Sequence, residues 1–245
     1  MILYFSATGN SKYVAWRLAE ATGERTISIL DAAGKVHLAP GENLGIVTPV
    51  YFLGLPHVVE AQLNGMEIVG GEGAYLYSVA TFGTTPGQTG ALIESILAKK
   101  GLHLSARFSV KMPDSWTPVF DLSNGRKVAK INRAEEGQIR EITSRILKKE
   151  TGDYMRRKLP MFAVRWYHRR YEQARETRHL HVLNRCIGFG RCARDCPMKA
   201  IDFSAGHPRW QPEQCAMCLT CLHNCPKFAI QYDDRTEKHG QYRHP

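Results

Sequence analysis

All seven cysteines of this 245-residue chain lie in one short segment, between Cys186 and Cys225. The downstream four have a close, regular spacing, Cys215-x2-Cys218-x2-Cys221-x3-Cys225, followed by Pro226. A chain kept in a reducing compartment has little use for disulfides, so clustered thiols of this kind predict metal or redox chemistry. Structural zinc is the alternative for any Cys-x2-Cys pair. Zinc takes four ligands, however, and this segment offers seven.

The cysteine pattern occurs twice. Upstream, Cys186, Cys192 and Cys196-Pro197 repeat it, and beyond the cysteines Lys199-Ala200-Ile201 matches Phe228-Ala229-Ile230. This duplication over residues 180–232 resembles a bacterial two-cluster ferredoxin, a small α+β domain. The resemblance implies a 4Fe–4S cluster on Cys196, Cys215, Cys218 and Cys221. It implies a second cluster on Cys186, Cys192 and Cys225.

One ligand expected from this resemblance is missing. The eighth cysteine would stand at position 189, where this chain has Phe189, which cannot coordinate iron. The second site could hold a 3Fe–4S cluster or a 4Fe–4S cluster with an open iron, or it could be empty with Phe189 as core. The intact spacing of the three remaining thiols favours an occupied site and does not choose between the two cluster forms. Asp195 is a conceivable oxygen ligand, although an ordinary surface charge is the simpler role.

A second candidate site lies at the start of the chain. The apolar run Ile2–Phe5 leads directly into Ser6-Ala7-Thr8-Gly9-Asn10-Ser11, and Val14, Leu18 and Ala21 then recur at a helical period. In a strand, turn and helix of this kind, backbone N–H groups, hydroxyls and the positive helix end converge on one point, which suits an anion. The nucleoside-triphosphate and dinucleotide fingerprints are both absent. The simpler alternative is a Ser/Thr helix cap.

Further strands and helices alternate along the first half of the chain. Apolar runs at residues 45–47, 74–80 and 108–110 predict strands, and the patterns at 58–63 and 91–99 predict helices. Such alternation predicts a doubly wound parallel sheet, which binds ligands at the carboxyl ends of its strands. Each post-strand loop carries glycine, hydroxyl or aromatic residues.

Over residues 1–150 the chain resembles a flavodoxin, because Phe5–Ser11 looks like that family's FMN phosphate loop. The resemblance implies an α/β fold that binds FMN. It implies phosphate contacts from Ser6, Thr8, Gly9, Asn10 and Ser11. It also implies ring contacts from two loops, at Pro49, Tyr51, Phe52 and Gly54 and at Thr81, Phe82 and Gly83. Tyr51 or Phe52 would stack on the ring, with core packing as the competing role, and Gly54 would allow a peptide flip at flavin N5.

The net charge of +10 is concentrated between the two cofactor regions. Residues 111–185 carry 18 Lys and Arg against 9 Asp and Glu, whereas residues 1–110 carry 7 against 8. Flavodoxins tend to be acidic, so this near-neutral first region departs from the resemblance. The expected organisation is an FMN domain at 1–150, a basic helical connector at 151–179, the iron–sulfur domain at 180–232 and a polar tail at 233–245. An amphipathic helix over Ile131–Lys149, ended by Gly152 as a stop signal, would be the last helix of the first domain.

The connector is rich in arginine and aromatic residues, notably Trp166-Tyr167-His168-Arg169-Arg170-Tyr171. Such a stretch invites a nucleic-acid interpretation, but no nucleic-acid motif accompanies it. We favour a solvated helix with Met161, Phe162, Trp166 and Tyr167 packed against a neighbouring domain. A basic collar that steers an acidic electron-transfer partner is a third use.

The combined pattern predicts an electron-transfer flavoprotein that passes electrons between FMN and iron–sulfur clusters in one chain, to or from a redox partner. The layout resembles flavodoxin–ferredoxin fusions of anaerobes. The alternatives are an FMN-dependent reductase of a small molecule, fed by the ferredoxin domain, or a redox-sensing regulator. No residue stands out as catalytic. With no apolar run of about 18 residues and no signal peptide, we expect no membrane span and a cytoplasmic location.

Overall fold

The computed structural model describes residues 1–32, 34–156, 158–211 and 215–245. Its centre is a six-stranded sheet in the order β2-β1-β4-β6-β7-β8, and every neighbouring pair in it is parallel. The strands are β1 (Ile2–Tyr4), β2 (Thr26–Ser28), β4 (Leu44–Pro49), β6 (Leu76–Phe82), β7 (Ala106–Lys111) and β8 (Gly152–Asp153). The chain reverses its direction of winding between β1 and β4, which is the doubly wound α/β order expected from the sequence.

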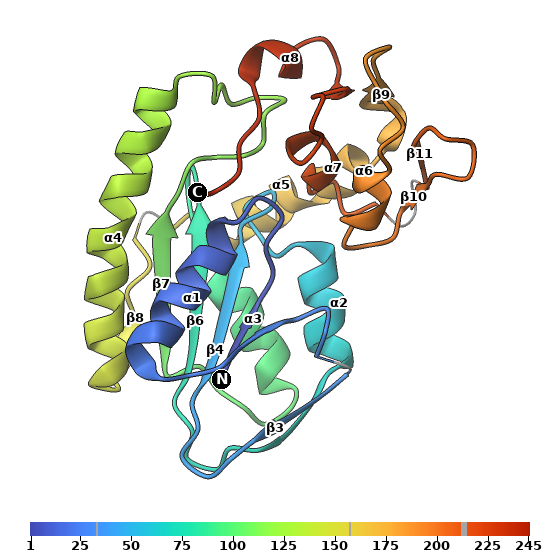
Figure 1. The fold of residues 1–245 in the computed structure, drawn as a ribbon. Coiled ribbons are helices and arrows are strands. Elements are labelled where there is room, and N and C mark those ends of the chain that lie inside the picture. Colours follow the sequence, from blue (N-terminus) through green and yellow to red (C-terminus); the bar gives the residue numbers. More distant parts are fainter. Residues whose placement is uncertain (33, 157, 212–214) are drawn as a thin grey trace.

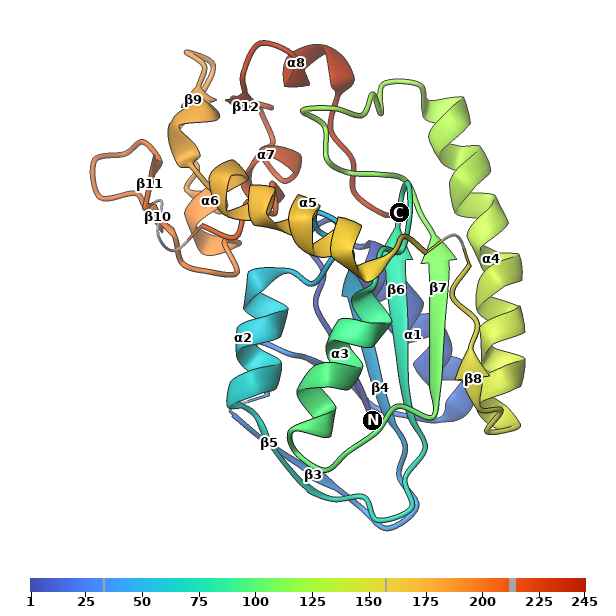
Figure 2. The ribbon, with the colours of Figure 1, turned by 180° about the vertical axis from the view of Figure 1, so that it is seen from behind.

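Helices cover both faces of the sheet (Figure 1). On one face lie α1 (Asn10–Thr22) and α4 (Gly125–Leu147), and on the other lie α2 (His57–Gly65) and α3 (Thr89–Ala98), seen from behind in Figure 2. Successive residues of each strand point to opposite faces of the sheet. Ile2 and Val47 pack with α1 and α4, whereas Leu3 and Ile46 pack with α2 and α3. Burial on both faces explains why these strands are apolar runs rather than alternating ones.

The predicted strands are present, and the structure adds elements that the sequence patterns did not indicate. These are β2, β8 and a separate parallel pair, β3 (Lys35–Leu38) with β5 (Glu67–Gly70). The expected helix at 131–149 is α4, which begins at Gly125 because the Asn124 side chain accepts a hydrogen bond from Lys127 N at 3.0 Å. It ends at Leu147. Gly152 does not end this helix directly but begins β8, which extends the sheet.

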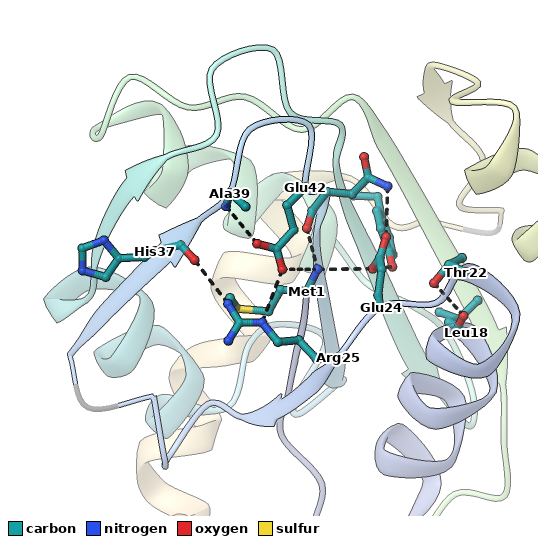
Figure 3. A network of polar contacts seen from close by, with 10 residues as sticks. Met1, Leu18, Thr22, Glu24, Arg25, His37, Ala39 and Glu42 are labelled. Atoms are coloured by element: carbon teal, nitrogen blue, oxygen red, sulfur yellow. Dashed lines mark hydrogen bonds and ion pairs between the residues drawn. The ribbon is translucent and has the colours of Figure 1, made fainter.

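The amino ends of the strands are held by a polar network around Met1 (Figure 3). The Met1 amine donates to Asn43 O at 2.8 Å and lies 3.3 Å from Glu42 Oε1 and 3.6 Å from Glu24 Oε2. Arg25 Nε also reaches Glu42 Oε1, at 3.4 Å. This network lies at the end of β1 opposite to the loops that form the site, so it fixes the sheet without entering the chemistry.

The iron–sulfur region is a small α+β unit above the carboxyl ends of the sheet (Figure 1). Its outer strands, β9 (Leu180–Val182) and β12 (Ile230–Tyr232), pair antiparallel, as do β10 (Ile201–Asp202) and β11 (Arg209–Trp210). Its short helices are η1 (Thr177–His179), α6 (Arg191–Arg194) and α7 (Thr220–His223), and α8 (Thr236–His239) follows β12. Its core is separate from the two cores of the sheet.

Helix α5 (Met161–Ala174) crosses from the sheet domain to the iron–sulfur unit (Figure 2). Its inner side buries Val164 and Tyr171. The expectation that Phe162 and Trp166 pack against a neighbouring domain is wrong, because they are 77% and 61% exposed. Tyr167 does contact the sheet domain, at Phe52. No helix in the described ranges is both long enough and apolar enough to cross a membrane.

Candidate flavin and iron–sulfur centres

A cavity of about 270 Å³ opens at the carboxyl ends of β1, β4, β6 and β7. Ten predicted flavin-site residues line it: Ser6, Thr8, Asn10, Ser11, Pro49, Tyr51, Phe52, Thr81, Phe82 and Gly83. Gly9 and Gly54 do not line it. Sequence reasoning did not assign the remaining contributors. They come from the same loops (Ala7, Val50, Leu53, Thr84 and Thr85), from the loop after β7, from Tyr167 and from the cysteine segment at Met217 and Cys218. The cavity therefore lies between the sheet, α5 and the iron–sulfur unit.

The loop after β1 retains free donors for an anion. Gly9, with φ 101°, precedes α1, and no side chain caps the first-turn N–H groups of that helix. The Ser6 hydroxyl oxygen is buried and has no hydrogen-bond partner among the described residues. The start of α1 and the buried Ser6 hydroxyl thus both have hydrogen-bond donors without a partner in the described part of the chain. A phosphate bound between them would accept hydrogen bonds from both.

Other side chains of this loop tie it to its neighbours. Asn10 Nδ2 donates to Pro113 O at 3.1 Å, Ser11 Oγ lies 2.7 Å from Thr81 Oγ1, and Thr8 Oγ1 donates to Ser115 Oγ at 3.3 Å. The loops after β1, β6 and β7 are thereby fixed together. Since Asn10 and Ser11 are already hydrogen-bonded through their side chains, their backbone N–H groups are what they can offer to a phosphate.

The polar tail after β12 returns to this same loop. Tyr242 is buried, and its hydroxyl donates to Asn10 Oδ1 at 2.7 Å. The backbone N–H of His244 donates to Thr8 O at 2.8 Å. A Cβ on Gly9 would lie 2.8 Å from His244 Cβ, so glycine allows the tail to approach. The end of the iron–sulfur half thus supports the anion loop of the other half.

The loop after β4 is a tight, strained turn. Tyr51 and Gly54 exchange backbone hydrogen bonds at 3.0 and 2.9 Å, while Phe52 and Leu53 have φ values of 47° and 68°. Two successive non-glycine residues at positive φ are unusual and are typical of functional sites. The N–H of Gly54 is occupied in this turn, and a Cβ on Gly54 would lie 2.8 Å from the His168 ring. In this conformation the absence of a side chain at Gly54 allows the His168 ring to pack against the turn.

Aromatic side chains join this turn to the iron–sulfur unit. Tyr171 is fully buried, stacks on Phe52 at 5.2 Å between ring centroids, and donates from its hydroxyl to Ala216 O at 2.7 Å. Tyr51 meets Tyr171 edge to face at 6.0 Å. Tyr51 and Phe52 therefore line the cavity and also pack in the interface. The sequence patterns did not identify Tyr171 as a buried contact between the two halves. Its separation of seven residues from Val164 places both on one face of a helix and could have indicated it.

A buried histidine also connects the two halves. His223 Nε2 donates to Ser115 O at 2.9 Å, and Nδ1 accepts from the Tyr242 N–H at 3.1 Å. Burial lowers the pKa of His223 to about 4, so the ring is neutral at physiological pH. Its two nitrogens thus hold the β7 loop and the tail in place through one uncharged ring.

Asp114 contributes a carboxyl group to the cavity. Its Oδ1 accepts from Trp116 N at 3.2 Å and its Oδ2 from Thr84 Oγ1 at 3.2 Å. Burial raises the pKa of Asp114, and these two hydrogen bonds only partly offset that rise. A Cβ on Gly83 would overlap this side chain, so glycine makes room for it. Asp114 lies in the loop that follows the predicted strand at residues 108–110, and this position could have indicated it as a site residue.

The cysteines surround two voids. Cys196, Cys215, Cys218 and Cys221 line one, and Cys186, Cys192 and Cys225 line the other together with Phe189. Cys218 lines both the four-thiol void and the cavity at the carboxyl ends of the sheet strands, the candidate flavin cavity. Among the described residues, no three His, Cys, Asp or Glu side chains converge closely enough for a single metal ion.

Burial disfavours the thiolate form of Cys215, Cys218 and Cys221 unless a cation is bound beside them. Burial raises the pKa of the Cys218 thiol to about 12 and raises that of Cys221 well above its ordinary value. Iron would supply the compensating positive charge, since metal binding deprotonates its cysteine ligands. Backbone N–H groups also point at sulfur, from Met217 to Cys215 Sγ at 3.3 Å and from Ala200 to Cys196 Sγ at 3.3 Å. These donors stabilise thiolate charge, so the residues present fit an iron–sulfur cluster.

The two cysteine loops share a backbone conformation as well as a sequence pattern. They are 29 residues apart in the chain, so Phe189 of the first loop corresponds to Cys218 of the second. Gly188 and Gly190, which flank Phe189, have φ values of 66° and 72°. Met217 and Leu219, which flank Cys218, have the same left-handed conformation at 48° and 55°. The loop around Phe189 therefore keeps the backbone conformation of the loop around Cys218, although the thiol itself is absent.

Phe189 does not serve as core. Its side chain is 56% exposed and lies 5.1 Å from the guanidinium of Arg194, which contradicts the core role that the third sequence alternative gave it. Asp195 does not line the three-thiol void. Its Oδ2 accepts from Arg191 Nε at 2.9 Å and from Asn224 Nδ2 at 3.4 Å, so it has the ordinary charged role that the sequence favoured.

Comparisons with known proteins agree with this architecture. The family described as flavodoxin domain matches residues 1–141, and that described as 4Fe-4S dicluster domain matches residues 178–226. A 43-residue stretch is 42% identical to one component of the Na(+)-translocating ferredoxin:NAD(+) oxidoreductase complex of Acetobacterium woodii. This stretch is 17% of the chain and spans only 13% of that component.

A solved structure, the Trp repressor binding protein from Bacillus subtilis, aligns with 60% of the chain and 96% of its own length, at 14% identity and a TM-score of 0.37. The flavodoxin match covers more than half of the chain. The chain therefore belongs to the flavodoxin domain family and carries a 4Fe–4S dicluster domain after it.

Proposed function

We propose that this chain is an electron-transfer flavoprotein that passes electrons between FMN and iron–sulfur clusters, to or from a separate redox partner. The flavodoxin and dicluster domains support electron transfer in general. The observation that carries the specific proposal is Cys218, whose side chain lines both the flavin cavity and the four-thiol void. A flavin and a cluster bound at these places would be direct neighbours.

Bound FMN exchanges one or two electrons and an iron–sulfur cluster exchanges one, so together they connect two-electron and one-electron reactions. In this proposal Ser6 and the start of α1 hold the phosphate, and the loops after β4 and β6 flank the ring. Cys196, Cys215, Cys218 and Cys221 hold a 4Fe–4S cluster. Cys186, Cys192 and Cys225 hold a second cluster, either 3Fe–4S or 4Fe–4S with an open iron.

A second candidate, reduction of a small molecule, is favoured by one observation. Asp114 presents to the cavity a carboxyl group whose pKa burial raises, and such a group can hold or deliver a proton. Rapid single-turnover oxidation of the reduced protein by a small molecule, with none by a protein carrier, would favour this candidate. The opposite result would favour the carrier.

The proposed function is tested by photoreducing the flavin anaerobically and following cluster reduction by EPR. In the native chain we expect reducing equivalents to reach the four-thiol cluster. Cys215→Ala with Cys221→Ala leaves only two thiols at that site and changes no residue of the flavin cavity, so it should abolish the transfer, with loss of about four irons per chain. Cys186→Ala is the matched control, because it leaves only two thiols at the other site. Transfer that persists in the double variant, or that is absent from the native chain, would contradict the proposal.

The phosphate site gives a separate prediction. Ser6→Ala should weaken FMN binding to the apoprotein by about 1–3 kcal/mol, roughly 5–150-fold in Kd, because one buried donor to the phosphate is lost. Ser78→Ala is the control. Its hydroxyl is also buried without a partner among the described residues, but it lies on β6 away from the cavity. Quenching of FMN fluorescence measures both, and an equal effect of the two substitutions would remove Ser6 from the phosphate site.

A further inference from the structure

The three-thiol void opens to solvent through an apolar surface. Ile187 and Phe189, both in the loop between Cys186 and Cys192, are 61% and 56% exposed, and both line that void. Large apolar side chains exposed next to each other are a mark of an interaction site. The four-thiol void is different, because Cys218 faces the flavin cavity and Tyr171 belongs to the core around it.

Positive charge surrounds this apolar surface. Arg194 lies over Phe189, and Lys227, which lines the three-thiol void, is exposed. Neither forms an ion pair with a carboxylate in the described part of the chain. Arg185 and Arg191 differ, because Glu237 and Asp195 neutralise them. The surface therefore presents two uncompensated cations beside an apolar centre, which is the charge complement of an acidic protein.

We propose that the surface formed by Ile187, Phe189, Arg194 and Lys227 is the docking site for an acidic one-electron carrier protein. The proposal rests on the proposed function and adds where electrons enter or leave. The flavin cavity adjoins the four-thiol void, and the three-thiol void adjoins the docking surface. The cluster that lacks a cysteine is thus the one nearest the partner, and the exposed phenylalanine that replaces this cysteine supplies part of the contact.

Helix α5 offers a competing surface and so provides the control. Its outer side presents Phe162, Trp166, Arg165 and Arg169, and these arginines too have no ion pair among the described residues. A partner there would meet the outside of α5, away from both thiol voids. Two charges are therefore reversed at each surface. The two double variants have the same change in net charge, so a difference in partner binding reports on the surface and not on the total charge.

The test measures binding of a purified acidic two-cluster ferredoxin to the holoprotein by anaerobic calorimetry at low and high salt. Arg194→Glu with Lys227→Glu should weaken binding about 10-fold or more at low salt, and the difference should shrink at high salt because exposed charges are screened. Ile187→Ser should weaken binding at both salt concentrations, since apolar contact is not screened. Arg165→Glu with Arg169→Glu should leave binding unchanged.

Weakening by the α5 variant alone, or by neither charge-reversal variant, would overturn the docking site. Transfer from the flavin to the four-thiol cluster is measured on the same samples and should be native in every variant, because none of the substituted residues lines the flavin cavity or the four-thiol void. Loss of that transfer from the native chain would instead refute the proposed function. The two failures are therefore distinguishable.

Discussion

Phe189→Cys is expected to complete the second cluster site. The loop around residue 189 already has the backbone conformation that presents Cys218, as the paired positive φ values show, so a thiol there would point where the missing ligand belongs. If the native cluster is 3Fe–4S, the variant should gain about one iron per chain and lose the EPR signal of the oxidised three-iron cluster. If it is 4Fe–4S with an open iron, the iron content should stay constant and sensitivity to external ligands should disappear.

Ile187→Cys is the matched control for this gain of ligand. Position 187 is equivalent to Ala216, which is not a ligand position in the repeat, and its side chain is as exposed as that of Phe189. The control should leave iron content and EPR spectra unchanged. A Phe189→Cys protein that contained iron for only one cluster would show that the three-thiol site is not occupied.

Tyr171→Ala is expected to have the largest effect on stability. The side chain is fully buried, stacks on Phe52 of the flavin cavity and donates a hydrogen bond to Ala216 of the iron–sulfur loop. Removing a buried aromatic ring costs about 3–5 kcal/mol. Tyr171→Phe keeps the ring and should cost about 1–2 kcal/mol, because only the hydrogen bond is lost.

Urea unfolding followed by flavin fluorescence measures these costs, and limited proteolysis at the connector reports separation of the two halves. Tyr167→Ala is the control, because Tyr167 lies on the same helix and contacts the same Phe52 ring at 6.0 Å but is 37% exposed. Its cost should be well below that of Tyr171→Ala. Equal costs for both would mean that the stack on Phe52, rather than the buried position of Tyr171, holds the halves together.

Local spacing accounts for what could be predicted from the sequence. Cysteines three residues apart are brought together by the backbone of one short loop, so Cys215, Cys218 and Cys221 are recognisable without a fold. Gly9 is likewise recognisable, because a strand followed by a glycine turn and a helix is a contiguous unit. The parallel sheet follows from the same kind of information, since apolar runs that alternate with helical periods leave few arrangements. Only its short edge strands, such as β2 and β8, lacked a pattern strong enough to see.

Contacts between distant segments could be decided only by the tertiary structure. Nothing in the sequence near Cys218 indicates that this cysteine lines the flavin cavity, and nothing near Tyr242 indicates that its hydroxyl reaches Asn10. The exposure of Phe189 and the burial of Tyr171 depend in the same way on how the two halves pack. The sequence by itself therefore determined the two domain families and the spacing of the candidate ligands, because both are carried by local patterns. The packing of one half on the other decided which thiol void adjoins the flavin cavity and which is lined by exposed side chains.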